Sequence, residues 1–186
     1  VPFSFCVNTS NIGTTGRLTV EDMKFLENQG NTAFSHGHEH IWHGRVSDEE
    51  ADNSLRTARN LLKEWGMSGY DILAYPYGNA TKKTREIARR YYRAAFSVRS
   101  DGYNTMPLNQ FYIFRQGIDS GNWEEYKNII DNAPDNSWIV FFGHVNNTGN
   151  DSSDYINGYR GLIQYIKSKD IPILNVKDAL DVKGNI

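Results

Sequence analysis

Four of the five histidines in this 186-residue sequence fall in one short stretch, residues 35–43 (SHGHEHIWH). His36 and His40 are four positions apart, and on a strand end followed by a turn this spacing can bring both imidazoles to one metal ion. Neutral imidazole nitrogen is a good ligand for Zn²⁺, and a catalytic zinc site keeps one position open for water. The pair therefore predicts a divalent-metal site, against two alternatives: a solvated histidine-rich loop, and a surface site that binds metal without catalysis.

A second motif, Tyr75-Pro76-Tyr77-Gly78, ends another apolar run. Proline and glycine fix a turn and let the backbone approach a ligand closely, while Tyr77 offers a ring, a hydroxyl group and a backbone N–H suited to an oxyanion. Taken alone, an ordinary aromatic turn is the favoured interpretation. The fifth histidine, His144, also follows an apolar run, residues 138–142, and Gly143.

Short apolar runs alternate with helical patterns along the chain, which predicts an α/β fold with a parallel sheet. The predicted strands are 2–7, 32–35, 71–75, 94–98, 112–115, 138–142 and 172–176, and the predicted helices are 19–29, 48–65, 82–92, 123–131, 155–168 and 177–180. About seven strands and no linker favour one domain, 1–186, shaped as a distorted or incomplete (β/α) barrel. Functional loops of such barrels follow the carboxyl ends of strands, so His36 and His144 are expected on one face.

Composition excludes several classes of protein. A formal net charge of -2 argues against a broadly basic nucleic-acid binder. No run approaches eighteen apolar residues, so no membrane span is expected, and the first residues do not resemble a signal peptide. The single cysteine excludes an internal disulfide framework and a cysteine-based zinc site.

Together these motifs resemble the polysaccharide deacetylases of the NodB-homology group, carbohydrate esterase family 4. The segment 36–40 resembles the family's metal motif, 76–78 its Pro-Tyr-Gly turn, and 142–144 its late strand ending in a catalytic histidine. Residues 13–23 are similar to the family's approach to the metal motif, so the resemblance covers essentially the whole chain. The Ala-Tyr-Pro-Tyr-Gly form is similar to the branch that acts on poly-N-acetylglucosamine.

The resemblance implies a metal-dependent hydrolase that removes acetyl groups from a polysaccharide or an N-acetylated sugar. His36 and His40 would hold the metal, His144 would act as general acid, and Tyr75, Pro76, Tyr77 and Gly78 would contact substrate. Zn²⁺ is the expected metal, with Co²⁺ and Ni²⁺ as alternatives, since all three suit imidazole. The expected partner is an acetylated polysaccharide or oligosaccharide, and the expected location is the cell envelope or the extracellular space.

Two departures from the family pattern matter. The family begins with a strand bearing Thr-Phe-Asp-Asp, which supplies the base and the third metal ligand, and this sequence contains no such segment. The chain is therefore expected to be weak or inactive as a deacetylase. It would be either a fragment or a degenerate member, and the missing strand would be supplied by an upstream segment or another chain. Ala74 stands where many members have an arginine that orients the catalytic aspartate. Arg115 is a candidate for that role. His38 is a candidate replacement for the absent aspartate.

Other interpretations stay open. One is a non-catalytic carbohydrate-binding protein on the same fold, and another is a metal hydrolase that uses His38 and acts on a different substrate. Glu39 and His43 are expected beside the site or in solvent. Four aromatic residues are candidates for stacking on sugars, with core packing favoured for each: Trp42, Tyr103, Tyr112 and Trp123.

Overall fold

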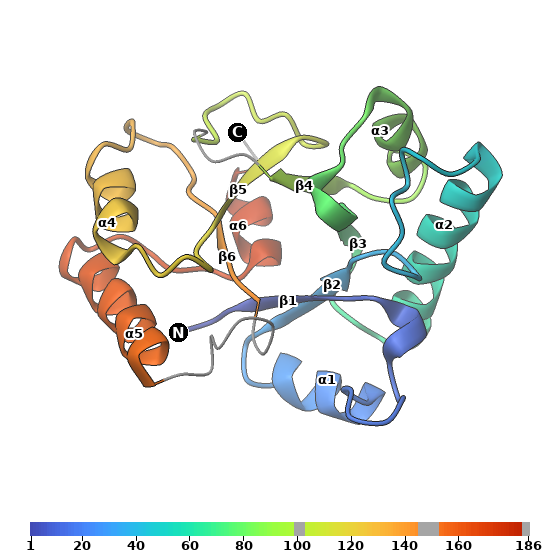
Figure 1. The fold of residues 1–186 in the computed structure, drawn as a ribbon, viewed down its shortest axis with the longest axis horizontal. Coiled ribbons are helices and arrows are strands. Elements are labelled where there is room, and N and C mark those ends of the chain that lie inside the picture. Colours follow the sequence, from blue (N-terminus) through green and yellow to red (C-terminus); the bar gives the residue numbers. More distant parts are fainter. Residues whose placement is uncertain (99–102, 145–152, 184–186) are drawn as a thin grey trace. The chain divides into compact units, whose positions relative to one another are not determined.

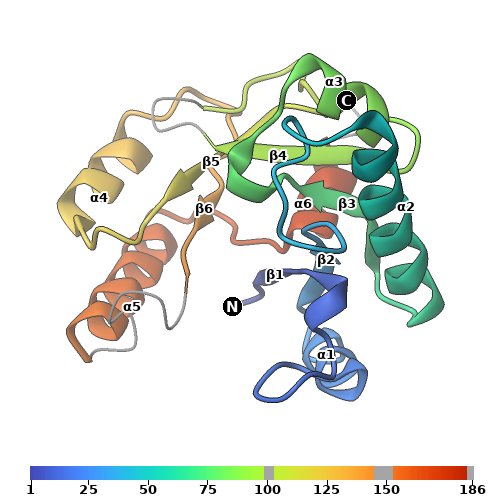
Figure 2. The ribbon, with the colours of Figure 1, turned by 45° about the vertical axis from the view of Figure 1, so that its right-hand side comes forward.

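The structure, a computed structural model, describes residues 1–98, 103–144 and 153–183 (Figures 1 and 2). The chain divides into two compact units. The first contains Val1–Ser97, Leu108–Ile113 and Leu174–Ile186, and the second contains Val98–Pro107 and Phe114–Ile173. No helix in the described part of the chain is both long enough and apolar enough to cross a membrane.

Parallel strands form the centre of the first unit. β1 (Ser4–Val7) pairs with β2 (Thr32–Ser35), β2 with β3 (Gly69–Ala74), and β3 with β4 (Ala94–Val98). All four β2 residues are buried, as expected for a strand flanked on both sides. The carboxyl ends of β2 and β3 therefore lie side by side, with Ser35 paired to Leu73.

Helices connect and cover these strands (Figure 1). They are α1 (Val20–Glu27), α2 (Asp48–Glu64), α3 (Lys82–Ala88) and α6 (Val176–Lys183), with single 3₁₀ turns η1 (Thr9–Asn11) and η2 (Pro76–Gly78). Thr19 begins α1 with a reciprocal capping box to Asp22, whose carboxylate accepts hydrogen bonds from the Thr19 backbone and hydroxyl that lower its pKa.

The apolar face of α2 packs onto the sheet. Leu55 is fully buried in a cluster with Leu73 of β3 and Tyr92, and Leu62 is fully buried in a second cluster with Met23. Their spacing of seven residues is two helical turns, which places both leucines on the same side of α2. This packing fixes the helix that follows the histidine-rich loop.

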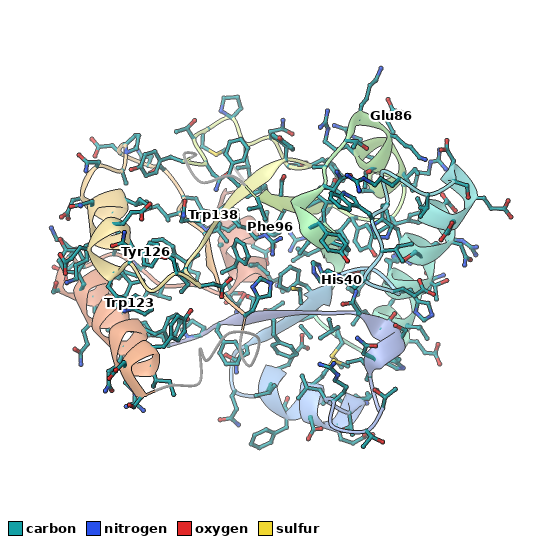
Figure 3. The ribbon with its side chains drawn as sticks, viewed as in Figure 1. His40, Glu86, Phe96, Trp123, Tyr126 and Trp138 are labelled. Atoms are coloured by element: carbon teal, nitrogen blue, oxygen red, sulfur yellow. The ribbon has the colours of Figure 1, made fainter. Side chains whose placement is uncertain are left out.

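The second unit is built from two short parallel strands and two helices. β5 (Ile113–Gly117) pairs with β6 (Phe141–Phe142), and α4 (Trp123–Asp131) packs against α5 (Ser153–Ser168). Tyr126, labelled with Trp123 in Figure 3, is buried in a cluster with Ile118, Ile130 and Leu162. Tyr126 also donates or accepts a hydrogen bond with Ser120 at 2.5 Å.

The prediction of an α/β fold of the incomplete-barrel type is confirmed, with two local corrections. The predicted strand 172–176 is not a strand: Leu174 is 43% exposed, and Asn175 instead caps α6 by accepting from the Asp178 backbone N–H at 2.8 Å. Of the predicted strand 138–142, only the last two residues pair with β5, because Trp138 forms an antiparallel bridge to Asn104. The described residues therefore contain six strands rather than seven.

Replacing Gly69 with alanine tests the packing of β2 on β3. A Cβ atom there would lie 2.5 Å from the Ala33 carbonyl oxygen and 2.8 Å from Thr32 Cγ2, so the two strands would have to separate. We expect Gly69→Ala to lower the free energy of unfolding by about 3 kcal/mol, the upper range for overpacking a core. Gly161→Ala in α5 is the control, because a Cβ there meets nothing within 4 Å. Urea unfolding should show no loss for the control, and a loss below 1 kcal/mol for Gly69→Ala would contradict the β2–β3 packing.

Candidate functional site

His36 is placed by the register of β2 on β3. It follows β2 directly, and its Nδ1 lies 2.7 Å from the Ala74 carbonyl oxygen at the end of β3. A carbonyl oxygen only accepts hydrogen bonds, so Nδ1 carries the proton and Nε2 presents its lone pair. The strand pairing therefore sets both the orientation and the tautomer of this imidazole. A backbone carbonyl is a usual partner for a metal-binding histidine.

His40 meets His36 through the matching nitrogen. The two Nε2 atoms are 3.1 Å apart, and the ring centres are 4.8 Å apart. Two imidazole nitrogens bound to one tetrahedral Zn²⁺ at about 2.05 Å would be separated by about 3.3 Å. The pair thus fits two ligand positions of one metal ion. Among residues 1–98, 103–144 and 153–183, no group of three or more histidine, cysteine or acidic side chains has metal-binding geometry.

Hydrogen bonds and a close contact fix the loop that carries the pair. Asn8 donates a hydrogen bond to the His36 carbonyl at 2.7 Å, and the Gly37 backbone N–H donates to Ser35 Oγ at 3.2 Å. Gly37 has φ +84°, and a Cβ there would lie 3.0 Å from His43 Cε1. Only glycine combines this left-handed backbone with that close approach.

His43 lies inside the unit, not in solvent. It is 1% exposed, and its Nε2 is 3.2 Å from Ser54 Oγ. Burial, assisted by the neighbouring His40, lowers the pKa of His43 from 6.5 to about 4. His43 is therefore neutral at physiological pH and packs as a support beneath the loop, which refines the expectation that it lies beside the site.

His38 takes a different direction from the pair. Its Nδ1 lies 2.8 Å from Thr9 Oγ1, and its Nε2 lies 3.8 Å from Glu39 Oε1. The left-handed backbone of Gly37 separates His38 from His36, so the chain is not simply extended between them. The role of His38 as a replacement ligand stays a prediction, and these contacts give it no support.

The 76–78 turn presents Tyr77 beside the pair. Tyr77 has φ 57° and ψ 12°, a left-handed conformation that is uncommon for a bulky residue and concentrates at functional sites. Its ring lies edge-on to His40 at 4.4 Å and stacks on Trp42 at 4.9 Å, and its hydroxyl donates to the His40 carbonyl at 3.3 Å. Tyr77 is 57% exposed, so it is the member of the turn that offers its side chain to a ligand. His40 is labelled in Figure 3.

Tyr75 and Pro76, predicted to contact substrate, are buried. The Tyr75 hydroxyl donates to the Phe111 carbonyl at 3.3 Å, and burial raises its pKa. Gly78 accepts a hydrogen bond from Ser97 Oγ at 2.9 Å through its carbonyl. These three residues shape the turn, and their substrate contacts stay a prediction.

His144, in the second unit, is held by a carboxylate. Its Nδ1 lies 2.7 Å from Asp119 Oδ2, and its backbone N–H donates to Asp119 Oδ1 at 2.7 Å. The carboxylate only accepts, so Nδ1 carries a proton and Nε2 is the nitrogen directed elsewhere. Asp119 was not predicted. The sequence feature that could have indicated Asp119 is its position two residues beyond the end of β5, because barrel folds carry functional side chains after their strands.

The remaining candidates pack within their own units. Arg115 is 6% exposed, with its guanidinium 4.7 Å from the Phe142 ring centre. Tyr103 donates to the Ile129 carbonyl, and Trp123 lies against Tyr126 and Tyr155. Tyr112 lies beneath the Arg85 guanidinium at 5.3 Å.

Known structures share this fold. The Xyl-CE4 domain of a multidomain xylanase from the hindgut metagenome of Trinervitermes trinervoides aligns over 99% of this chain and 78% of its own, with TM-score 0.67 and 15% identity. A CE4 family pseudoenzyme from Bacillus anthracis aligns over 96% and 55%, with TM-score 0.63 and 12% identity. A polysaccharide deacetylase from Bacillus cereus aligns over 61% of this chain, with TM-score 0.54 and 17% identity; the aligned part is 36% of that protein.

Sequence comparison gives the family. A search of curated proteins finds no match. The profile of the polysaccharide deacetylase family matches residues 1–95, which carry β1 to β3, the imidazole pair and the 76–78 turn. This match covers half of the chain and includes two of the three motifs found in the sequence. The chain belongs to the polysaccharide deacetylase family.

Proposed function

We propose that this protein is a metal-dependent hydrolase that removes acetyl groups from a polysaccharide or an N-acetylated sugar. The observation that carries the proposal is the imidazole pair, in which the Ala74 carbonyl fixes the tautomer of His36 and the two Nε2 atoms are 3.1 Å apart. Such a pair is preorganised for a divalent cation, and Zn²⁺, Co²⁺ and Ni²⁺ all suit these ligands. The family acts on polysaccharide, so we place the protein at the cell envelope or outside the cell.

The chain's own residues have distinct parts in the reaction. His36 and His40 hold the metal, which when bound polarises the acetyl carbonyl and lowers the pKa of water. His144 donates the proton that the leaving amine or alcohol needs, from Nε2, because Asp119 occupies Nδ1. The Tyr77 ring borders the pair, and its backbone N–H is the proposed oxyanion donor.

The third ligand and the base come, in this proposal, from a segment outside residues 1–186. Family members supply both from a strand that precedes the metal motif. In the described residues β1 pairs with β2 alone, and three of its four residues are only half-buried. In this proposal an upstream segment or another chain pairs with β1.

Asparagine at Asp119 tests how His144 is held. The amide cannot enforce the Nδ1–H tautomer as the carboxylate does, so the imidazole loses its fixed orientation. We expect Asp119→Asn to lower the rate of acetate release about a hundred-fold, the lower end of the range for a positioned general acid, while leaving metal content unchanged. Unchanged release would show that the contact is structural only.

Acetate release tests the proposed function directly. Residues 1–186, and the same chain joined to a family Thr-Phe-Asp-Asp strand, are each loaded with Zn²⁺, Co²⁺ or Ni²⁺. Each is then given β-1,6-linked N-acetylglucosamine oligomers or acetylated xylan. We expect slow or no release by residues 1–186 and clear, metal-dependent release by the completed protein. No release by a folded, metal-loaded completed protein from either substrate would overturn the proposal.

The second candidate is a non-catalytic carbohydrate-binding protein. It is favoured by the lack of a third metal-binding side chain beside the imidazole pair in the described parts of the chain. The similarity in fold to a pseudoenzyme is consistent with it. This protein would bind the same oligomers equally well before and after metal removal, and it would release no acetate.

A further inference from the structure

An exposed arginine stands at the end of an aromatic stack that begins at the imidazole pair. The Tyr77 ring lies against His40, and Trp42 stacks on Tyr77 at an interplanar angle of 25°. The Arg45 guanidinium carbon lies 3.6 Å from the centre of the Trp42 ring. The stack His40–Tyr77–Trp42–Arg45 therefore links the metal-site histidine to a cation on the surface of the first unit.

Trp42 holds its neighbours in place and has no free face for a sugar. A guanidinium 3.6 Å above the indole centre fills one face, so the Tyr77 ring stacks on the other. The indole Nε1 is buried without a hydrogen-bond partner among the described residues. Both facts agree with packing, the favoured interpretation of Trp42, rather than with stacking on a sugar ring. Its structural effect is to restrict Arg45 to one orientation.

Stacking of the Arg45 guanidinium on Trp42 leaves its hydrogen-bonding edge available. The flat face lies on the indole, so the N–H groups project from the rim of the guanidinium, in the fork that matches a carboxylate. In the described parts of the chain, no acidic side chain forms an ion pair with Arg45. A preordered guanidinium loses less entropy when it binds an anion than a free side chain does.

Two acidic side chains on α2 and α3 lie close to lysines. Near Arg45, a Cβ at Gly44 would lie within 3 Å of side-chain atoms of Asn79 and Thr81. The first acidic residue of α2, Asp48, is paired with Lys83 at 2.8 Å, which reduces its repulsion of an anion. On α3, Glu86 points outward in Figure 3 and lies 4.0 Å from Lys82.

We propose that Arg45 is a specificity residue for an acidic polysaccharide: it binds the carboxylate of a uronic acid near the acetylated sugar. This inference rests on the proposed function, because it takes the imidazole pair as the place where the acetyl group is bound. The substrate class is then a polymer that contains both acetylated sugars and uronic acids. A neutral polymer would leave this ordered cation without a partner.

Binding of two matched hexasaccharides tests the proposal. One alternates N-acetylglucosamine with glucuronic acid, and the other is the neutral N-acetylglucosamine hexamer of chitin. Calorimetry at low salt should show about ten-fold tighter binding of the acidic hexamer, as expected for one charge-assisted hydrogen-bonded pair. Arg45→Gln should bring the two affinities within two-fold of each other. Lys82→Gln, at a side chain that is 86% exposed on α3, should keep the preference.

Each other outcome overturns the proposal: equal affinities in the wild type, a preference kept by Arg45→Gln, or no binding of either hexamer. Arg45→Lys keeps the charge without the planar fork and should retain only part of the preference. Failure of the proposed function looks different, because binding would then prefer the acidic hexamer without any acetate release from the completed protein. Acetate release with no acidic preference would leave the proposed function standing and remove the role of Arg45.

Discussion

Alanine at His144 is expected to lower the rate of acetate release by the completed, metal-loaded protein about a thousand-fold, within the 10²–10⁴ range for a positioned general acid. Asp119 accepts a hydrogen bond from Nδ1–H of His144 at 2.7 Å, so it orients the ring and stabilises the imidazolium, whose Nε2–H can protonate a leaving group. Removal of the imidazole leaves water as the only proton donor, so the chemical step slows while the metal ligands are untouched.

The measurement is single-turnover acetate release, with bound metal determined on the same samples. Asp131→Asn is the matched control, because it breaks a surface pair with Lys169 and Tyr165 in the same unit. Its rate should stay within two-fold of the wild type. A His144→Ala protein that keeps more than a tenth of the wild-type rate would exclude His144 as the general acid.

Acidification from pH 7.5 to pH 5 is expected to cost the protein about 2 kcal/mol of stability through His43 alone. The pKa of His43 is about 4 in the folded protein, because the ring is buried, against an ordinary value of 6.5. Below pH 6.5 the unfolded chain therefore binds a proton that the folded chain does not, and stability falls as pH falls. The loss is about 3 kcal/mol at pH 4 and levels off at about 3.4 kcal/mol below that pH.

Urea unfolding at pH 7.5 and pH 5 measures this loss, with His43→Leu as the comparison. The variant has no titrating group at position 43, so its stability should change about 2 kcal/mol less than that of the wild type over this interval. Aspartates with lowered pKa, such as Asp22 and Asp181, act at lower pH and do not disturb the comparison. Equal pH dependence in the two proteins would show that His43 is not buried and neutral.

Much of the site was predictable because strand ends are visible in the sequence. The apolar run 32–35 became β2 with the same bounds, and it placed His36 at its carboxyl end beside β3. The four-residue spacing then brought His40 back to His36. An apolar strand and the short turn after it are local features, so the pair could be predicted from the sequence, although its orientation depends on the pairing of β2 with β3.

Other features depended on contacts that spacing does not encode. His38 was a candidate to replace the absent aspartate as a ligand, but its Nδ1 lies against Thr9, beyond the left-handed backbone at Gly37. Asp119 and His144 are 25 residues apart, and nothing in either local pattern links them. The run 172–176 has strand-like composition, yet it has no pairing partner and leads into α6, because sheet membership depends on neighbours as much as on propensity.

The most direct test of the account is the amount of metal per chain in protein that is joined to a family Thr-Phe-Asp-Asp strand and purified without added metal or a histidine tag. The account predicts close to one divalent ion per chain, lost in His36→Ala and kept in His38→Ala, because only the former removes a member of the Nε2 pair. A completed protein without bound metal, or one in which His36→Ala keeps its metal, would contradict the metal site and leave the carbohydrate-binding alternative in its place.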